Sequence, residues 1–369
     1  MHMCAIDAIV GAGPAGCAAA LTLRRYLPKM DVLLISKQTA NSSHGSGVGE
    51  SLSPGVLPLL DYLGIKEEFF RLGNLPSWST ASSWGTEQLF EREYLFIGRG
   101  SGWQIDRCKF DAWLLGIVEG ADIRCVQARA VQTAYNCEGW CIDLDDGETI
   151  EADAIVDATG RAAWLSRSQG LSPRRDDALV AEARWYVHDE SASNLSGALV
   201  ETTEYGWWYT SMLPDRRGVA MFMTDADLRN KATWEEKLAR APATRARMTS
   251  WHATGESAVR VANSQKSAMV AGKGWVSAGD AAVAFDPVSS LGIGFSLRSG
   301  MEAARVAVAA SEKDDAAAAV YDASVSSIYA DYLRRLRKIY WREHRWPAAP
   351  FWARRRRNDQ RKETDALGN

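Results

Sequence analysis

The sequence predicts an α/β protein (α+β overall) with an inserted antiparallel sheet and helices at the C-terminus. Three observations predict this class. The pattern Gly11-x-Gly13-x-x-Gly16 stands directly between an apolar strand-like run and an apolar helical run, as in the first turn of a Rossmann-like dinucleotide-binding domain. A second apolar strand ends at Asp157, and from Leu179 apolar and polar residues alternate as in a strand with one buried face.

The glycines of the first turn have separate tasks. Gly11 makes the tight turn, Gly13 lets the backbone approach a pyrophosphate, and Gly16 lets the helix pack close to the strand. The pyrophosphate then lies on free N–H groups at the start of the helix, around Pro14 and Ala15, where the helix dipole favours negative charge.

The second strand does not decide which dinucleotide binds. It would normally end in an acidic residue that holds the ribose hydroxyls, but Ser36 and Lys37 stand there, and a basic residue could indicate NADP. Two later segments favour a flavin instead: residues 153–161 read DAIVDATGR, and residues 274–294 read GWVSAGDAAVAFDPVSSLGIG.

Together these segments resemble the superfamily of FAD-dependent monooxygenases and flavin-dependent halogenases, which has the p-hydroxybenzoate hydroxylase-like fold and an FAD domain of the glutathione reductase-2 type. The resemblance covers nearly the whole chain. It implies that Asp280, after Gly279, holds the ribityl and phosphate region, and that Pro287 leads into a helix whose start faces the flavin. It also implies FAD contacts by Ala158, Thr159, Gly160, Gly292, Ile293, Gly294, Arg107 and the loop residues Gly49, Glu50 and Ser51.

The pattern of elements divides the chain into three parts. We expect a discontinuous FAD-binding domain over residues 1–74, 98–178 and 259–325, a substrate domain over 75–97 and 179–258, and a basic helical segment over 326–369. Expected helices are 54–70, 106–118, 234–253, 296–310 and 316–340, and expected strands lie within 75–96, 121–157, 179–188 and 201–224.

Composition excludes several classes of function. With 46% apolar and 24% charged residues, the chain is typical of a soluble globular protein, and we expect no transmembrane segment, no signal peptide and a cytoplasmic location. Six cysteines without a CxxC motif and five scattered histidines predict no metal site. Nucleic acid is not an expected partner, because the net charge of −3 reflects a mostly acidic chain with a basic end. The run Arg354–Arg357 is expected to form either a solvated helix end or a docking patch for an acidic macromolecule.

The candidate substrate pocket is aromatic, because the chain has 15 tryptophans. Trp78, Trp84 and Trp103 fall where the family lines its substrate cavity, although core packing is the alternative for each tryptophan. No catalytic residue is assigned. The remaining pocket candidates are Trp207, Trp208, Tyr209, Ser211 and Glu50.

Two departures from the tryptophan halogenases favour a hydroxylase. Residues 209–214 read YTSMLP where the halogenases carry Trp-x-Trp-x-Ile-Pro, and residues 76–85 contain no lysine where they carry their catalytic lysine. The stretch Pro287-x-x-Ser290-x-Gly292 does resemble part of a halogenase signature, but it lies beside the flavin and does not decide between the two.

Within the superfamily the chain most resembles flavoproteins that modify protein-bound tryptophan, namely the maturases of lysine ε-oxidase and glycine oxidase, which contain cysteine tryptophylquinone. The matching stretches are 102–115, 156–161, 206–214 and the C-terminal Glu343, Arg345, Trp346, Phe351 and Trp352.

This resemblance implies an FAD-dependent monooxygenase that hydroxylates an aromatic group, foremost an indole, on a protein or ribosomal peptide through a flavin C4a-hydroperoxide. NAD(P)H is the expected electron source, either directly or through a flavin reductase. A small-molecule aromatic hydroxylase or halogenase, a prenyl-lipid reductase of the same fold and a flavin-binding partner protein without turnover remain alternatives.

Overall fold

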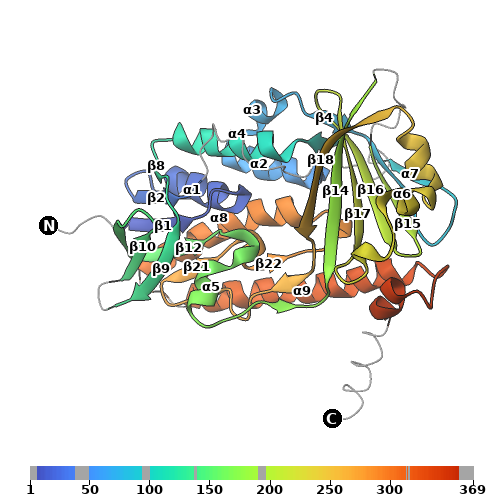
Figure 1. Cartoon of the computed structure of the whole chain (residues 1–369). Helices are drawn as coiled ribbons and strands as arrows, with labels where there is room; N and C mark the ends of the chain where they lie inside the picture. The colour runs from blue at the N-terminus through green and yellow to red at the C-terminus, as the bar shows by residue number, and fades with distance from the viewer. Residues whose placement is uncertain are drawn as a thin grey trace, which may run out of the picture.

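The computed structural model describes residues 6–37, 50–93, 100–136, 139–189, 197–312, 314 and 316–356, which form two parts lying side by side (Figure 1). The first part is built on a six-stranded, largely parallel sheet, and the second on a seven-stranded sheet. Helix α9 (Ala316–Trp341) runs along the base of both parts (Figure 1). Among the described helices, none is both long and apolar enough to cross a membrane.

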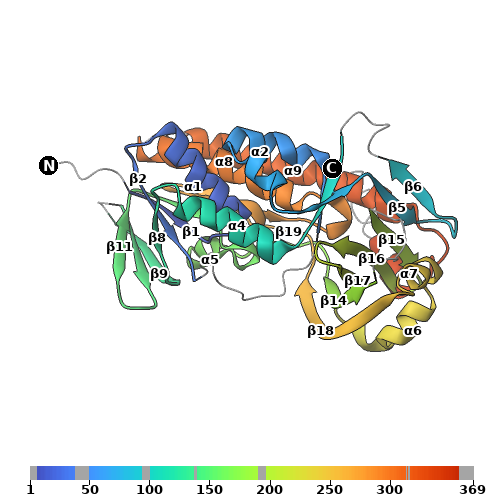
Figure 2. The ribbon, with the colours of Figure 1, turned by 90° about the horizontal axis from the view of Figure 1, so that it is seen from above.

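The six-stranded sheet is buried on both faces, which explains why its strands read as continuous apolar runs. Helices α1 (Pro14–Tyr26), α4 (Arg107–Glu119) and α8 (Gly292–Ser311) pack on one side, where Figure 2 shows α1, α4 and α8 together. On the other side lie α5 (Trp164–Ser168) and the antiparallel sheet of β9 (Ala130–Tyr135), β10 (Trp140–Leu144) and β11 (Thr149–Ala152). The strand order is β20 (Ala271–Gly272), β21 (Trp275–Ser277), β12 (Ala154–Asp157), β1 (Ile6–Val10), β2 (Asp31–Ile35) and β8 (Arg124–Val126).

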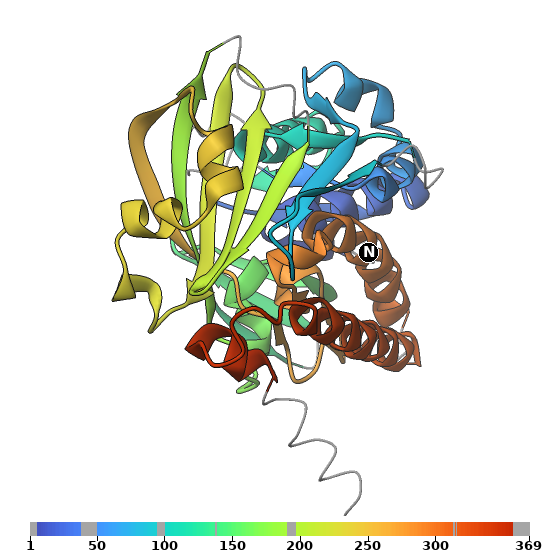
Figure 3. The ribbon, with the colours of Figure 1, turned by 90° about the vertical axis from the view of Figure 1, so that its right-hand side faces the viewer.

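The seven-stranded sheet curves around one side of the molecule (Figure 3). Its inner face joins the main core through alternate residues such as Ala183 and Trp185, and its outer face packs against α6 (Trp234–Ala239) and α7 (Pro242–Arg247). Neighbouring strands are antiparallel except for the parallel pair β15 and β5. The strand order is β18 (Trp251–Val261), β14 (Leu179–His188), β17 (Arg217–Asp225), β16 (Gly206–Leu213), β15 (Ala198–Thr203), β5 (Ser79–Ser83) and β6 (Phe90–Glu93).

Two expected helices are interrupted in the structure. The stretch 54–70 is divided into a 3-10 turn (Pro54–Val56), α2 (Leu57–Leu63) and α3 (Lys66–Phe70), because Gly64 takes the left-handed conformation (φ 77°) that ends a helix. The stretch 234–253 is divided between α6 and α7 at Pro242 and continues as β18, so the prediction of one helix there was wrong.

Short elements join the two parts. One small sheet contains β3 (Glu50–Leu52), β7 (Gly102–Ile105) and β4 (Leu75–Ser77), and another contains β13 (Arg174–Arg175), β19 (Gln265–Lys266) and β22 (Val283–Ala284). Further 3-10 turns are Gly160–Ala162, Arg229–Lys231, Gly279–Ala281 and Pro287–Ser289, and a last short helix spans 350–356.

Candidate functional site

A cavity of about 700 Å³ lies where the glycine turn after β1 and the start of α8 meet the inner face of the seven-stranded sheet. It brings together most of the residues that the sequence predicts to hold the cofactor. Those that line it are Gly11, Gly13, Pro14, Ala15, Ser36, Lys37, Glu50, Ser51, Arg107, Ala158, Thr159, Gly160, Asp280, Pro287, Gly292, Ile293 and Gly294.

Three of the predicted cofactor residues are not placed in the wall of the cavity. Gly16 is buried in α1, and a Cβ atom there would lie 1.8 Å from the carbonyl oxygen of Gly11. Gly279 has φ +59°, and its Cβ would lie 2.9 Å from the Cβ of Ala15. Both glycines therefore shape the backbone behind the cavity, while Gly49 lies outside the described residues.

The glycine turn leaves a space that suits a pyrophosphate. Gly11 has φ +109° and crosses close to Ala158, whereas a Cβ at Gly13 would meet no atom within 4 Å. Helix α1 begins with Pro14 after Gly13, and its first turn carries no acidic side chain that would repel an anion. Free N–H groups at this helix start, open backbone at Gly13 and cationic Arg107 in the same cavity are the donor set that a dinucleotide phosphate needs, so the residues fit FAD.

Arg107 is held in place by two carboxylates. Its guanidinium lies 2.5 Å from Glu50 on β3 and 3.0 Å from Asp111, one turn further along α4. Burial lowers the pKa of Arg107. The negative charges of Glu50 and Asp111 raise it by more, so the pKa lies above its usual value and the side chain remains charged. Burial raises the pKa of Glu50, and Arg107 opposes that shift. Asp111, which sequence reasoning missed, could have been found from its i+4 spacing to Arg107.

Asp280 lies in the cavity beside a cation that the sequence analysis did not single out. Arg161 Nε is 3.3 Å from Asp280 Oδ2, and Arg161 also donates to the backbone carbonyl of Asn263 at 2.6 Å. Burial raises the pKa of Asp280, and Arg161 and Arg107 lower it. The signal for Arg161 was its position directly after Gly160 in the matching stretch 156–161.

Asp280→Ala is expected to weaken FAD binding about ten-fold or more, because a hydrogen bond to a charged group contributes about 1.5–3 kcal/mol. Titration of the apoprotein with FAD, followed by flavin fluorescence, measures the affinity. Asp146→Ala, in the exposed turn between β10 and β11, is the matched control. An unchanged FAD affinity in Asp280→Ala would remove this carboxylate from the cofactor site.

The inner face of the seven-stranded sheet supplies the other wall of the cavity. Ala181, Met221 and Met223 line it together with Tyr209, whose hydroxyl lies 2.9 Å from Ser51 Oγ. Ser51 in turn donates to Gln104 at 2.7 Å. Burial raises the pKa of Tyr209 to about 12, although hydrogen bonds with serines lower it. This part of the wall is therefore apolar, with one neutral, positioned phenol, and Arg260 of β18 also lines the cavity.

Ser211 reaches the same polar cluster without lining the cavity. It is fully buried and donates from Oγ to Gln104 Oε1 at 2.5 Å, the same oxygen that accepts from Ser51. Gln104 Nε2 donates onward to Ser77 at 3.1 Å. Sequence reasoning missed Gln104, which ties β7 to β16 beneath Tyr209.

The tryptophans predicted for the pocket lie elsewhere, which differs from the expectation. Trp207 is buried and donates to the hydroxyl of Tyr340 at 3.1 Å, and Trp208 packs on the outer face against Trp234 with ring centroids 4.6 Å apart. Trp84 donates to the carbonyl of Ile339 at 2.9 Å. Adjacent residues of a strand point to opposite faces, and the helical end of the chain covers the part of the inner face where Trp207 lies. Trp103 packs against Phe69, and Trp78 is exposed.

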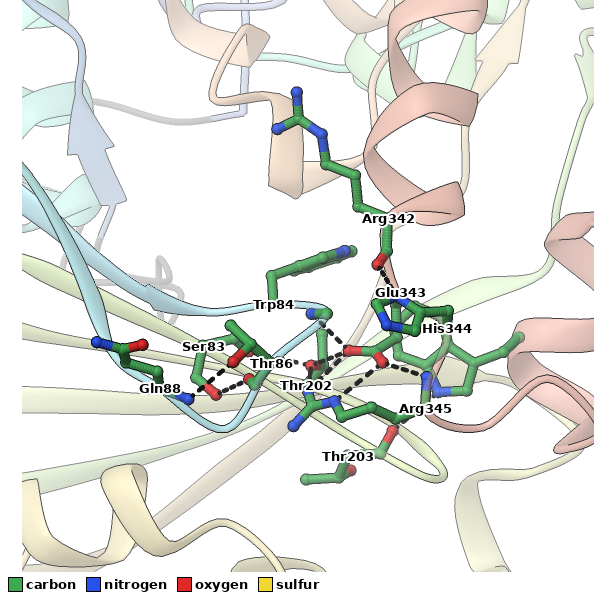
Figure 4. A network of polar contacts seen from close by, with 12 residues as sticks. Ser83, Trp84, Thr86, Gln88, Thr202, Thr203, Arg342, Glu343, His344 and Arg345 are labelled. Carbon is green, nitrogen blue, oxygen red and sulfur yellow. Dashed lines mark hydrogen bonds and ion pairs between the residues drawn. The ribbon is translucent and has the colours of Figure 1, made fainter.

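A buried ion pair fastens the end of the chain to the seven-stranded sheet (Figure 4). Glu343 is fully buried and accepts from Arg345 at 2.7 Å, from Thr202 of β15 at 2.6 Å and from the backbone N–H of Gly85 at 2.9 Å. Burial alone would raise the pKa of Glu343, but the hydrogen bonds from Arg345, Thr202 and Gly85 lower it to about 2.

Two arginines of the run Arg354–Arg357 are paired with carboxylates of the protein, which differs from a fully solvated helix end, and the docking patch stays a prediction. Arg354 pairs with Asp225 and Asp227, and Arg355 pairs with Asp225 at 2.8 Å. Phe351 and Trp352 are 0% and 1% exposed. A truncation after Trp346, intended to remove the basic run, would therefore also remove two core residues. Residues 357–369 lie outside the described part of the chain.

Lysine is nearly missing from the cavity. Among the described residues that line it, Lys37 is the only lysine, and its ammonium group lies 2.8 Å from Asp145, on the side of the second strand. In the ranges that the structure describes, no three His, Cys, Asp or Glu side chains are grouped as metal ligands.

Comparison with known proteins finds a matching family model and curated relatives that are similar over most of the chain. The tryptophan halogenase family model matches residues 8–84 and 93–367. The chain is 34% identical over 363 residues to the putative FAD-dependent oxidoreductase LodB of Marinomonas mediterranea, covering 95% of this chain and 96% of that protein. It is 25% identical over 319 residues to a 1H-pyrrole-2-carbonyl-[peptidyl-carrier protein] brominase of Pseudoalteromonas luteoviolacea, covering 80% and 75%.

Solved structures agree in fold. The flavin-dependent halogenase CmlS superposes with a TM-score of 0.85 at 22% identity, covering 100% of this chain and 71% of that one. The peptidyl tryptophan dihydroxylase QhpG, essential for tryptophylquinone cofactor biogenesis, superposes with a TM-score of 0.73 at 24% identity, covering 96% and 79%. With the FAD cradle in place and a family model that spans nearly its whole length, the chain belongs to the tryptophan halogenase family of FAD-dependent oxidoreductases.

Proposed function

We propose that this enzyme is an FAD-dependent monooxygenase that hydroxylates the indole of a tryptophan within a protein or ribosomal peptide. The observation that carries the proposal is the cavity itself, in which residues that fit FAD face a substrate wall of Ala181, Tyr209, Met221 and Met223 that holds no lysine among its described residues. Residues 76–85, where the halogenases that the chain resembles carry their catalytic lysine, also contain none. The likeness to LodB and to QhpG supports the choice of a polypeptide substrate.

FAD, reduced by NAD(P)H directly or through a flavin reductase, would supply activated oxygen from O₂ in this cavity. The residues that would hold it are the start of α1, Arg107 and Asp280. The thioethers of Met221 and Met223 offer favourable contacts to an aromatic ring and keep water from it. Tyr209, kept neutral and bonded to Ser51, presents a hydroxyl that can orient the substrate.

The proposal is tested with purified enzyme, FAD, NADH and a flavin reductase under air. The substrates are free L-tryptophan and, separately, the precursor polypeptide of a lysine ε-oxidase. We expect the mass of one or more oxygen atoms to be added to a tryptophan of the polypeptide and little change in the free amino acid. Efficient hydroxylation of free tryptophan with no change in the polypeptide would favour a small-molecule hydroxylase instead.

Because none of the described residues beside the substrate wall is a lysine, no halogenated product is expected in the presence of chloride or bromide, reduced FAD and O₂. The similarity to the pyrrole brominase makes halogenation the alternative to exclude. Mass spectrometry of reactions with L-tryptophan and indole checks this, with a flavin-dependent tryptophan halogenase as positive control. Chlorinated or brominated product above a reaction without enzyme would reverse the choice between the two activities.

A further inference from the structure

Strand β18 forms one free edge of the seven-stranded sheet. In the part of the chain that the structure describes, its only ladder partner is β14, and Figure 2 shows it as the outermost strand on that side. From His252 to Val261 its residues are exposed or half-buried, and Val259 and Val261 are among the exposed large apolar side chains.

The register shows which backbone groups face away from the sheet. The N–H of Ala262 donates to the carbonyl of Leu179 at 3.0 Å, so the backbone of Ala262 faces the strand β14. In an antiparallel ladder, alternate residues direct their N–H and C=O groups to the same side. Arg260 and Ala258 therefore bond to β14, and Ser257, Val259 and Val261 direct theirs outward. On this outward side the carbonyl oxygen of Val259 accepts from Arg260 Nη1 at 3.2 Å, while the N–H of Val259 points away from β14.

This half of the edge has fewer of the features that protect other sheet edges from pairing. The first half of β18 is bent by a bulge around Gly255 (φ +85°), and the opposite edge strand β6 carries charges at three of its four positions. Residues 257–261 read SAVRV, without proline or lysine, and the backbone of the one charged residue, Arg260, faces β14.

The same stretch lies between two hollows. On the outer face, Ser257, Ala258 and Val259 line an open groove of about 720 Å³ together with Arg184 and Trp234. Towards the FAD domain, the stretch from Arg260 to Ala262 lines the cofactor cavity. The edge strand thus leads from an open groove on the surface into the cavity.

We propose that the free edge of β18 over Ser257–Val261 binds an extended segment of the tryptophan-bearing polypeptide as an additional strand. The inference rests on the proposed function and names how its substrate docks. Side chains of an added strand alternate between the inner and outer faces of the seven-stranded sheet. Those of residues that pair opposite Arg260 would lie on the cavity side, and those opposite Val259 would lie over the outer groove. Main-chain hydrogen bonds supply affinity that does not depend on sequence, and the two hollows select side chains.

The test compares Val259→Pro with Val259→Ala. Proline removes only an outward N–H, which an edge strand tolerates, and alanine shortens the same side chain while keeping that N–H. For the lysine ε-oxidase precursor polypeptide, Val259→Pro is expected to raise KM about ten-fold or more and Val259→Ala by less than about three-fold. FAD affinity is expected to be unchanged in both variants, which also shows that they fold.

A second measurement needs no variant. Hydrogen exchange of the wild-type holoenzyme, with and without the polypeptide, is expected to show slower exchange at the amides of Ser257, Val259 and Val261 when the polypeptide is bound. Equal exchange with and without the polypeptide overturns the inference, and so does an unchanged KM in Val259→Pro. If the protein forms a concentration-dependent dimer that Val259→Pro abolishes without changing KM, the edge binds a second copy of the chain and not the polypeptide, which also overturns the inference. Failure of the wild type to oxidise the polypeptide overturns the proposed function and this inference together.

Discussion

Gly13→Val is expected to abolish FAD binding while leaving the protein folded. A Cβ at Gly13 meets no protein atom within 4 Å, so the valine side chain can be accommodated, but it occupies the space through which the backbone approaches the pyrophosphate. The measurement is the flavin content of the purified protein and its affinity after titration with FAD, with circular dichroism to show that it is folded.

Two other glycine substitutions sharpen this test. Gly16→Val is expected to prevent folding, because its Cβ would lie 1.8 Å from the carbonyl oxygen of Gly11. Gly120→Ala, at the end of α4, makes only an ordinary contact of 3.4 Å and should bind FAD normally. Wild-type FAD affinity in Gly13→Val would show that the glycine turn does not hold the cofactor.

Glu343→Gln is expected to lower the free energy of unfolding by about 3–5 kcal/mol, because it leaves Arg345 without its buried partner. The substitution keeps the volume of the side chain and removes its charge, so the loss measures the ion pair that joins the chain end to β15 and the backbone of Gly85. Urea unfolding followed by tryptophan fluorescence gives the free energy. Glu204→Gln, which breaks the exposed pair with Arg240, is the control and should cost less than about 1 kcal/mol.

The effect of Glu343 depends on pH in a defined direction. Its pKa is lowered from the ordinary 4.5 to about 2, so its contribution to stability is fully present above about pH 4.5 and is lost as pH falls towards 2. The difference in stability between the wild type and Glu343→Gln should shrink over that interval. A difference that stays constant down to pH 2 would mean that Glu343 does not act through its charge.

The family and the cofactor could be predicted from the sequence because their signals are local. The glycine turn, the stretch 156–161 and residues 279–294 each encode a backbone shape over a few residues, and the alternation from Leu179 encodes a strand with one buried face. The family assignment and the α/β fold are confirmed by the comparisons. The domain boundaries and the role of each cofactor residue stay predictions.

The tertiary structure decided what each side chain faces. Composition and spacing gave the same weight to Trp207, Trp208 and Tyr209, but strand order and the helix that covers the inner face leave only Tyr209 in the cavity. Likewise, the sequence left Arg354 and Arg355 as part of either a solvated helix end or a docking patch. Only the tertiary structure places Asp225, which is distant in sequence, beside them. The periodicity of a sequence determines where a side chain points relative to its own strand or helix. Which residue it contacts depends on the register and packing between distant segments, and a local sequence pattern does not contain that information.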